Sequence, residues 1–89
     1  MERQIFTITN PTGLHARPAN VFAKTAKKYA CDVKIEAGGK AINGKSIVSV
    51  LSAGIIQGAQ IVLITEGEDE HGAMQELGDF LRSGCGELG

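Results

Sequence analysis

The pattern of hydrophobic and polar positions predicts seven secondary-structure elements. Residues 4–9 alternate in character and are rich in β-branched side chains, so they predict a strand with Phe6 and Ile8 facing inward. From about Ala16 to Tyr29 the apolar residues recur at the spacing of one helix face. They are Ala19, Phe22, Ala23 and Ala26.

The middle of the chain predicts a hairpin and then a short helix. Gly38–Gly39 is a strong two-residue turn signal, and it separates predicted strands at 32–37 and 40–43. Ser46 is then placed to cap a helix over 47–53, because its hydroxyl can accept a hydrogen bond from a first-turn N–H group.

The last third predicts an interior strand and a final helix. The strand spans 60–66 and contains four consecutive apolar residues. Acidic residues at 68–70 suit a helix N-terminus, and the apolar stripe that follows is Ala73, Leu77, Phe80 and Leu81. Residues 84–89 predict a frayed tail. The order βαββαβα predicts an α+β fold in one domain over 1–89, with helices covering one side of a four-stranded sheet.

Composition and length narrow the classes of function. A chain of 89 residues is too small to enclose a large cofactor cavity, so we expect no cofactor. With three Phe, one Tyr and no Trp, a base-stacking surface is not expected. The net charge of −1 gives no reason to expect nucleic acid or a membrane surface as partner, and no apolar run is long enough to span a membrane.

The small net charge hides an asymmetry between the two halves of the chain. Residues 1–45 carry eight bases and three acids, a net +5, whereas residues 46–89 carry one base and seven acids, a net −6. Such a division suggests a directed interaction surface. The alternative is that the halves interleave in space and the division averages out.

Two cysteines, Cys31 and Cys85, lie far apart and form no C-x-x-C pair, so we expect neither a metal site nor a redox motif. The N-terminus has no signal-peptide pattern. These observations favour a cytoplasmic protein with two free thiols. A bridge between the two cysteines is the alternative.

The first candidate for chemistry is the segment Gly13-Leu14-His15-Ala16-Arg17-Pro18-Ala19. Pro18 is tolerated only in a first helical turn, so the helix must begin near His15. First-turn N–H groups attract an anion, and Arg17 adds a guanidinium. A neutral imidazole there can act as a nucleophile toward phosphorus. The plain alternative is a histidine that only caps the helix.

The second candidate is the segment that begins at Ser46. Its plain role is an N-cap, and phosphorylation there would be tolerated electrostatically. If Val50 faces the core, a helix this short cannot also bury Ile47, Val48 and Leu51, and an exposed apolar patch suggests docking. The alternative is a fully buried helix.

The third candidate is the polar face of the first helix, which carries Asn20, Lys24, Lys27 and Lys28. Its lysines can steer acidic partners, or they can be an ordinary solvated face.

The motif Gly-Leu-His-Ala-Arg-Pro-Ala at 13–19, followed by Gly-Lys-Ser-Ile at 44–47, resembles the HPr family. HPr proteins are the phosphocarriers of the bacterial phosphoenolpyruvate-dependent sugar phosphotransferase system. The resemblance covers almost the whole chain. It implies an open-faced β-sandwich whose antiparallel sheet has the order 1-4-2-3, with three helices on one face.

The resemblance also implies a function without catalysis by the protein itself. His15 would accept a phosphoryl group at Nδ1 from phosphorylated enzyme I and pass it to a sugar-specific EIIA protein or domain, with Arg17 stabilising the phosphate. The patch near 46–53 would dock both partners. The expected protein is a cytoplasmic monomer.

In many relatives the serine matching Ser46 is phosphorylated by HPr kinase/phosphorylase, and the phosphoserine form binds a catabolite control repressor. Ile47 resembles that branch, although Val48 stands where the branch often has Met. The alternatives are a mainly regulatory paralogue, in which the active histidine is replaced, and a carrier of a nitrogen-related phosphorelay. The presence of His15 argues against the former.

Overall fold

The computed structural model describes residues 1–86 and contains the seven elements in the predicted order. The strands are β1 (Glu2–Thr7), β2 (Asp32–Ala37), β3 (Lys40–Asn43) and β4 (Gln60–Glu66), and the helices are α1 (Ala16–Lys27), α2 (Ile47–Ser52) and α3 (Glu70–Arg82). The strands form one antiparallel sheet in the order β1-β4-β2-β3. This confirms the α+β fold with sheet order 1-4-2-3 and β4 as an interior strand.

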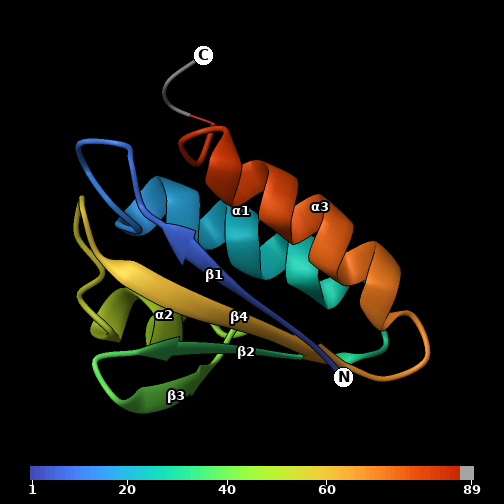
Figure 1. Ribbon diagram of the computed structural model, residues 1–89. Helices are drawn as coiled ribbons and strands as arrows, with labels where there is room; N and C mark the ends of the chain where they lie inside the picture. The colour runs from blue at the N-terminus through green and yellow to red at the C-terminus, as the bar shows by residue number, and fades with distance from the viewer. Residues whose placement is uncertain (87–89) are drawn as a thin grey trace.

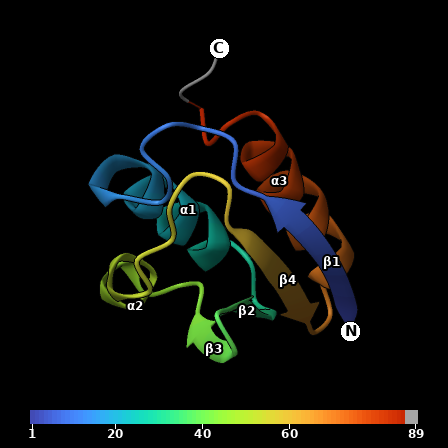
Figure 2. The same cartoon turned by 60° about the vertical axis from the view of Figure 1, so that its left-hand side comes forward.

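The three helices lie on one side of the sheet, as expected (Figure 1). Helices α1 and α3 run side by side, while α2 is short and packs beside α1 and β3 (Figure 2). Alternation along each strand sends one set of side chains into the core between the layers. The core side of the sheet is formed by Phe6, Val33, Ile35, Ile61 and Leu63.

Several element boundaries differ from the sequence-based expectation. The first strand spans 2–7 rather than 4–9, because Glu2 pairs with Thr65 and the ladder continues to Thr7 opposite Gln60. Phe6 and Ile8 are nevertheless both buried, as predicted. α1 ends at Lys27, two residues before the predicted end, and α2 ends at Ser52 with Ala53 as its C-cap.

The end of α3 also differs from expectation. Phe80 is only half-buried, whereas the rest of the predicted stripe is buried. Gly84 and Cys85 are buried rather than frayed, because Cys85 N–H donates to Phe80 O at 3.0 Å and Gly84, at φ +77°, closes the helix. Residues 87–89 of the predicted tail lie outside the described residues.

Both cysteines are buried free thiols. Cys31 lies beside Asp69 at the start of α3, whereas Cys85 follows its end, and a helix of 13 residues is about 20 Å long. A bridge between them is therefore ruled out in this fold. Burial, together with the nearby Asp69 carboxylate, raises the pKa of the Cys31 thiol to about 11.

Polar contacts fasten the end of α1 to α3. The Asp69 carboxylate accepts hydrogen bonds from the N–H groups of Ala30 and Cys31, both at 2.8 Å, which lower the pKa of Asp69. Glu76 accepts from Lys28 at 2.8 Å and from the Tyr29 hydroxyl at 2.5 Å. These two donors lower the pKa of Glu76, and the Glu76 bond raises the pKa of Tyr29 to about 12. Here, residues from the basic first half of the chain therefore pack against residues from the acidic second half.

Candidate functional site

His15 is the N-cap residue of α1 and is exposed. Its backbone is extended (φ −87°, ψ −163°), and its side chain makes no capping hydrogen bond to the helix. The carbonyl of His15 accepts the first helical hydrogen bond, from Ala19 N–H at 2.8 Å. The imidazole therefore lies at the positive end of α1 without being used to close that end.

The first turn of α1 carries the positive end of the helix dipole. Pro18 is buried in this turn and has no N–H group, so it costs the helix no hydrogen bond. No acidic residue lies in the turn. Arg17 is the second helical residue and is exposed. His15 and Arg17 therefore both lie at the start of α1, where the helix was expected to begin.

The segment before His15 rests on the connection between α2 and β4. Leu14 is buried, and its N–H donates to Ile55 O at 3.0 Å. Gly13 has φ +64°, and a Cβ there would lie 2.3 Å from Ile55 O and 2.8 Å from the Cα of Ile56. Only glycine fits this close approach. These contacts with the α2–β4 connection therefore fix the backbone position of the two residues directly before His15.

Ser46 is the N-cap of α2, as predicted. Its Oγ accepts a hydrogen bond from Ser49 N–H at 3.2 Å, and its backbone is extended. The side chain is half-buried. Lys45 next to it reaches across to the turn that follows α1, where its ammonium donates to Tyr29 O at 2.7 Å.

The helix α2 is not fully buried. Val50 is inaccessible, whereas Val48 is 72% and Leu51 40% exposed and Ile47 is half-buried. This outcome favours the exposed-patch interpretation. We call Ile47, Val48 and Leu51, together with the exposed Val21 and Ile56, the apolar rim.

Two members of the apolar rim were not predicted. Ile56 is 69% exposed and its backbone touches Gly13, which places it beside the His15 segment. Val21 is 42% exposed, one turn after Arg17 on α1. The pair Ile55–Ile56 was an available signal, because two adjacent apolar residues in a short connection seldom both face inward. Here Ile55 is the buried one.

The predicted polar docking residues lie at increasing distances from His15. Asn20 is half-buried, whereas Lys24 and Lys27 are exposed in the last turn of α1. At 1.5 Å per residue, these lysines lie about 14 and 18 Å along the helix from His15. Arg17 therefore lies in the first turn, two residues from His15, whereas the lysines lie at the far end of the helix.

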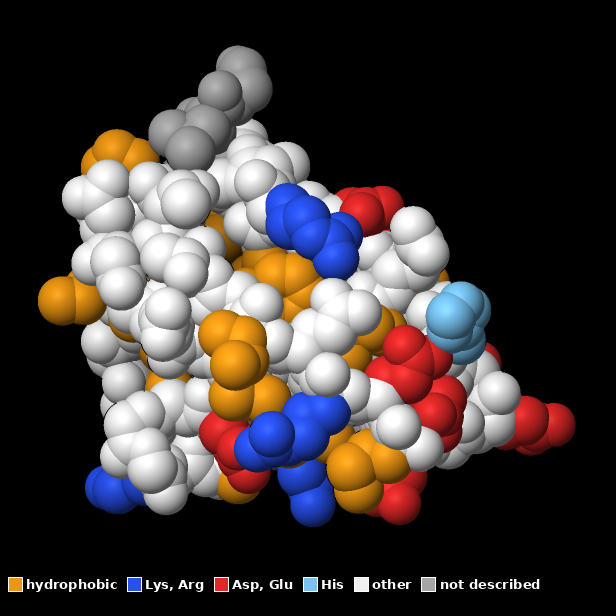
Figure 3. Space-filling model, viewed as in Figure 1, with side chains coloured by type: hydrophobic (Ala, Val, Ile, Leu, Met, Phe, Trp, Pro, Cys, Tyr) orange, Lys and Arg blue, Asp and Glu red, His pale blue; other side chains and the backbone are white. Residues whose placement is uncertain are grey.

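Acidic side chains gather away from His15. The His15 segment, α2 and the α2–β4 connection share one end of the sheet, while the β4–α3 turn lies at the other (Figure 1). Figure 3 shows the acidic side chains concentrated on the side of the molecule where this turn lies. The β4–α3 turn and the residues that flank it include Glu66, Glu68, Asp69 and Glu70.

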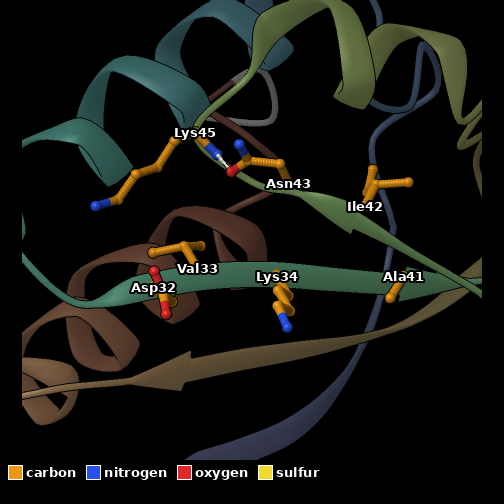
Figure 4. Close-up of a pocket in the computed structure, with 7 residues that line it drawn as sticks. All are labelled: Asp32, Val33, Lys34, Ala41, Ile42, Asn43 and Lys45. Atoms are coloured by element: carbon orange, nitrogen blue, oxygen red, sulfur yellow. Dashed lines mark hydrogen bonds between the residues drawn. The ribbon is translucent and has the colours of Figure 1, made fainter.

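A surface cavity of about 440 Å³ lies away from this site, at the β2–β3 edge (Figure 4). Asn43 and Lys45 lie on one side of β2, and Lys34 points to the other side. Since these polar groups do not converge, the cavity has no evident ligand. Within residues 1–86, no group of three or more His, Cys, Asp or Glu side chains is arranged to hold a metal ion. No helix in that range is long and apolar enough to cross a membrane.

Comparisons with known proteins identify the class. A family model described as "PTS HPr component phosphorylation site" matches residues 2–83. HPr-C-His from Thermoanaerobacter tengcongensis is similar at 41% identity, with 98% of each chain covered and a TM-score of 0.94. Phosphocarrier protein HPr from Bacillus anthracis is similar at 34% identity, covering 90% of this chain and 95% of that chain, with a TM-score of 0.86.

A third similar structure is Crh, the catabolite repression HPr of Bacillus subtilis, crystallised as a swapped dimer. It shares 36% identity over 94% of this chain and 97% of that chain, with a TM-score of 0.75. The fold is thus that of a small phosphocarrier protein. The chain belongs to the HPr family of the phosphotransferase system. Family membership implies phosphotransferase partners such as enzyme I and EIIA.

Proposed function

We propose that this protein is a phosphocarrier of the sugar phosphotransferase system and that His15 is its phosphoryl acceptor. The observation that carries the proposal is an exposed imidazole at the start of α1, beside Arg17 and next to an apolar rim. Nδ1 of His15 attacks the phosphorus of phosphorylated enzyme I. The bond between phosphorus and the donor breaks, and its electron pair stays on the donor. A second transfer moves the group to EIIA.

The charge of the bound phosphoryl group needs local compensation. Arg17 supplies a guanidinium that can pair with phosphate oxygens, and the first-turn amides of α1 add their dipoles. The chain binds and passes on the group without turning over a substrate by itself, so it is a stoichiometric carrier rather than an enzyme.

Labelling tests this assignment directly. Incubation with phosphoenolpyruvate and enzyme I should produce an acid-labile, base-stable phosphohistidine. His15→Ala should abolish the label. His71→Ala is the matched control, because His71 is also exposed but pairs with Glu2 at 2.6 Å on another surface. Retention of the label in His15→Ala would overturn the proposal.

The apolar rim is the proposed docking surface for both partners, with Asn20, Lys24 and Lys27 at its margin. Exposed lysines on α1 suit acidic partner surfaces and would act mainly on association rates. Changing Lys24 and Lys27 together to Glu should slow transfer from enzyme I, and more strongly at low salt than at high salt. Equal rates across ionic strength would exclude steering by these lysines.

We further propose that Ser46 is a regulatory phosphorylation site for HPr kinase/phosphorylase. A phosphoryl group there would lie at the N-terminus of α2, whose first turn contains no acid, so the helix can tolerate it. ATP and the kinase should label Ser46. Ser46→Ala should abolish the label, and Ser52→Ala, an exposed serine on the same helix, should not.

A mainly regulatory role is the second candidate, supported by the similarity to Crh. In that case phospho-Ser46 would bind a catabolite control repressor, while His15 would take up phosphoryl groups poorly. His15 favours the carrier role, for a sugar or a nitrogen-related phosphorelay. We propose that the protein acts as a monomer, and light scattering during gel filtration separates this from a swapped dimer.

A further inference from the structure

Asn10 is a polar side chain buried at the base of the His15 segment. Asn10 and Thr65 are the two fully buried polar side chains of residues 1–86. The Asn10 side-chain amide Nδ2 donates to Gly13 O at 2.8 Å and to Thr12 Oγ1 at 3.3 Å. The backbone carbonyl of Asn10 accepts from Gly13 N–H at 3.1 Å. Asn10 therefore forms hydrogen bonds with both backbone groups of Gly13, the N–H and the carbonyl.

The backbone that leads to His15 is fixed at successive points. Asn10 holds the carbonyl of Gly13, Ile55 O holds the N–H of Leu14, and the carbonyl of His15 begins α1 through Ala19 N–H. Two of these contacts are made between backbone atoms. The contact of Asn10 with the Gly13 carbonyl depends on the identity of a side chain.

We propose that Asn10 is a positioning residue for His15: its amide holds the Gly13 carbonyl and so fixes the imidazole for phosphoryl transfer. This inference rests on the proposed role of His15. Without the amide, the buried Gly13 carbonyl would have to move to find another donor. A displacement of about 1 Å in a reacting group can cost roughly 100-fold in rate, so even a partial shift should be measurable.

The test compares Asn10→Ala with Thr65→Val. Thr65 is the matched control, because its Oγ1 donates to Glu70 O at 2.9 Å near the opposite end of the molecule. Both variants lose a hydrogen bond from a fully buried polar residue's side chain to the backbone. With both folded, as judged by thermal melts, phosphoryl transfer from enzyme I is measured over a range of carrier concentrations. Asn10→Ala should lower kcat about 10-fold with KM within about 2-fold, whereas Thr65→Val should change neither.

Amide hydrogen exchange provides a readout that needs no phosphoryl donor. Exchange of the Leu14 N–H should be about 10-fold faster in Asn10→Ala and unchanged in Thr65→Val, because only the first change loosens the segment. Should Asn10→Ala fail to fold, Asn10→Ser is used, since its hydroxyl is too short to replace the amide bond.

Each outcome decides between the two proposals. A wild-type kcat in folded Asn10→Ala, or an equal fall in Thr65→Val, overturns the positioning role. Failure of the wild-type protein to accept a phosphoryl group overturns the proposed function instead. In that case the Leu14 exchange rates still show whether Asn10 fixes the segment.

Discussion

Ile56 and Ile5 are the same residue type with nearly the same exposed fraction, 69% and 67%. Ile56 belongs to the apolar rim beside the His15 segment, whereas Ile5 lies in β1 on the open face of the sheet. Replacing each by Ala removes the same atoms at nearly the same degree of exposure. The pair therefore separates docking through the apolar rim from a general effect of surface hydrophobicity.

The expected magnitude follows from the exposed fraction. An Ile→Ala change removes three carbon groups, each worth about 0.8 kcal/mol when buried. With 69% of Ile56 still to be covered, complete burial by a partner is worth about 1.7 kcal/mol. That energy corresponds to about a 15-fold weaker Kd for Ile56→Ala. Ile5→Ala should leave the Kd unchanged.

The assay is titration calorimetry of each variant with enzyme I, accompanied by a thermal melt. Both variants lose a similar small amount of packing within the protein, so their folding stabilities should fall by similar amounts, about 1 kcal/mol or less. Equal Kd values for Ile56→Ala and the wild type, or equal weakening by the two variants, would refute docking through this part of the rim.

Three further predictions concern stability and reactivity. The lowered pKa of Asp69 means that its ionised form stabilises the fold at pH values above its unfolded pKa, and that this contribution is lost as pH falls through the folded pKa. Asp69→Asn should therefore lower the melting temperature at pH 7 and have little effect near pH 2; a constant difference would contradict this. Gly44→Ala should lower the melting temperature more than Gly72→Ala, because a Cβ at Gly44 would lie 2.7 Å from a β2 side chain, whereas one at Gly72 in α3 would make only an ordinary contact at 3.5 Å. Cys31 and Cys85 should react with a thiol reagent at pH 8 only when urea unfolds the chain, and rapid reaction of the native protein would argue against their burial.

Much of the fold follows from local patterns in the sequence. Alternation and turn signals placed β2, β3 and β4 at their observed residues, because these strands begin or end at residues that mark turns. The start of β1 was misplaced because Glu2 enters the strand only through its partner Thr65, which is distant in sequence. Local pattern carries no information on such a pairing.

For a similar reason, only part of the candidate site could be predicted from the sequence. The positions of His15, Arg17 and Ser46 at helix starts are local properties, so Pro18 and the N-cap pattern were enough to place them. The part proposed for Asn10 depends on its complete burial, which only the tertiary structure creates. From composition alone, Asn10 was simply part of a turn.

The contacts between the His15 segment and the α2–β4 connection have a consequence for how such a carrier can diversify. The bond from Leu14 N–H to Ile55 O joins main-chain atoms and leaves the outward side chains of the apolar rim unconstrained. Substitutions at Val48, Leu51 and Ile56 can therefore accumulate without moving the imidazole. The fold thus separates the main-chain contacts that hold the His15 segment from the outward side chains of the apolar rim, so partner recognition can change through the rim alone.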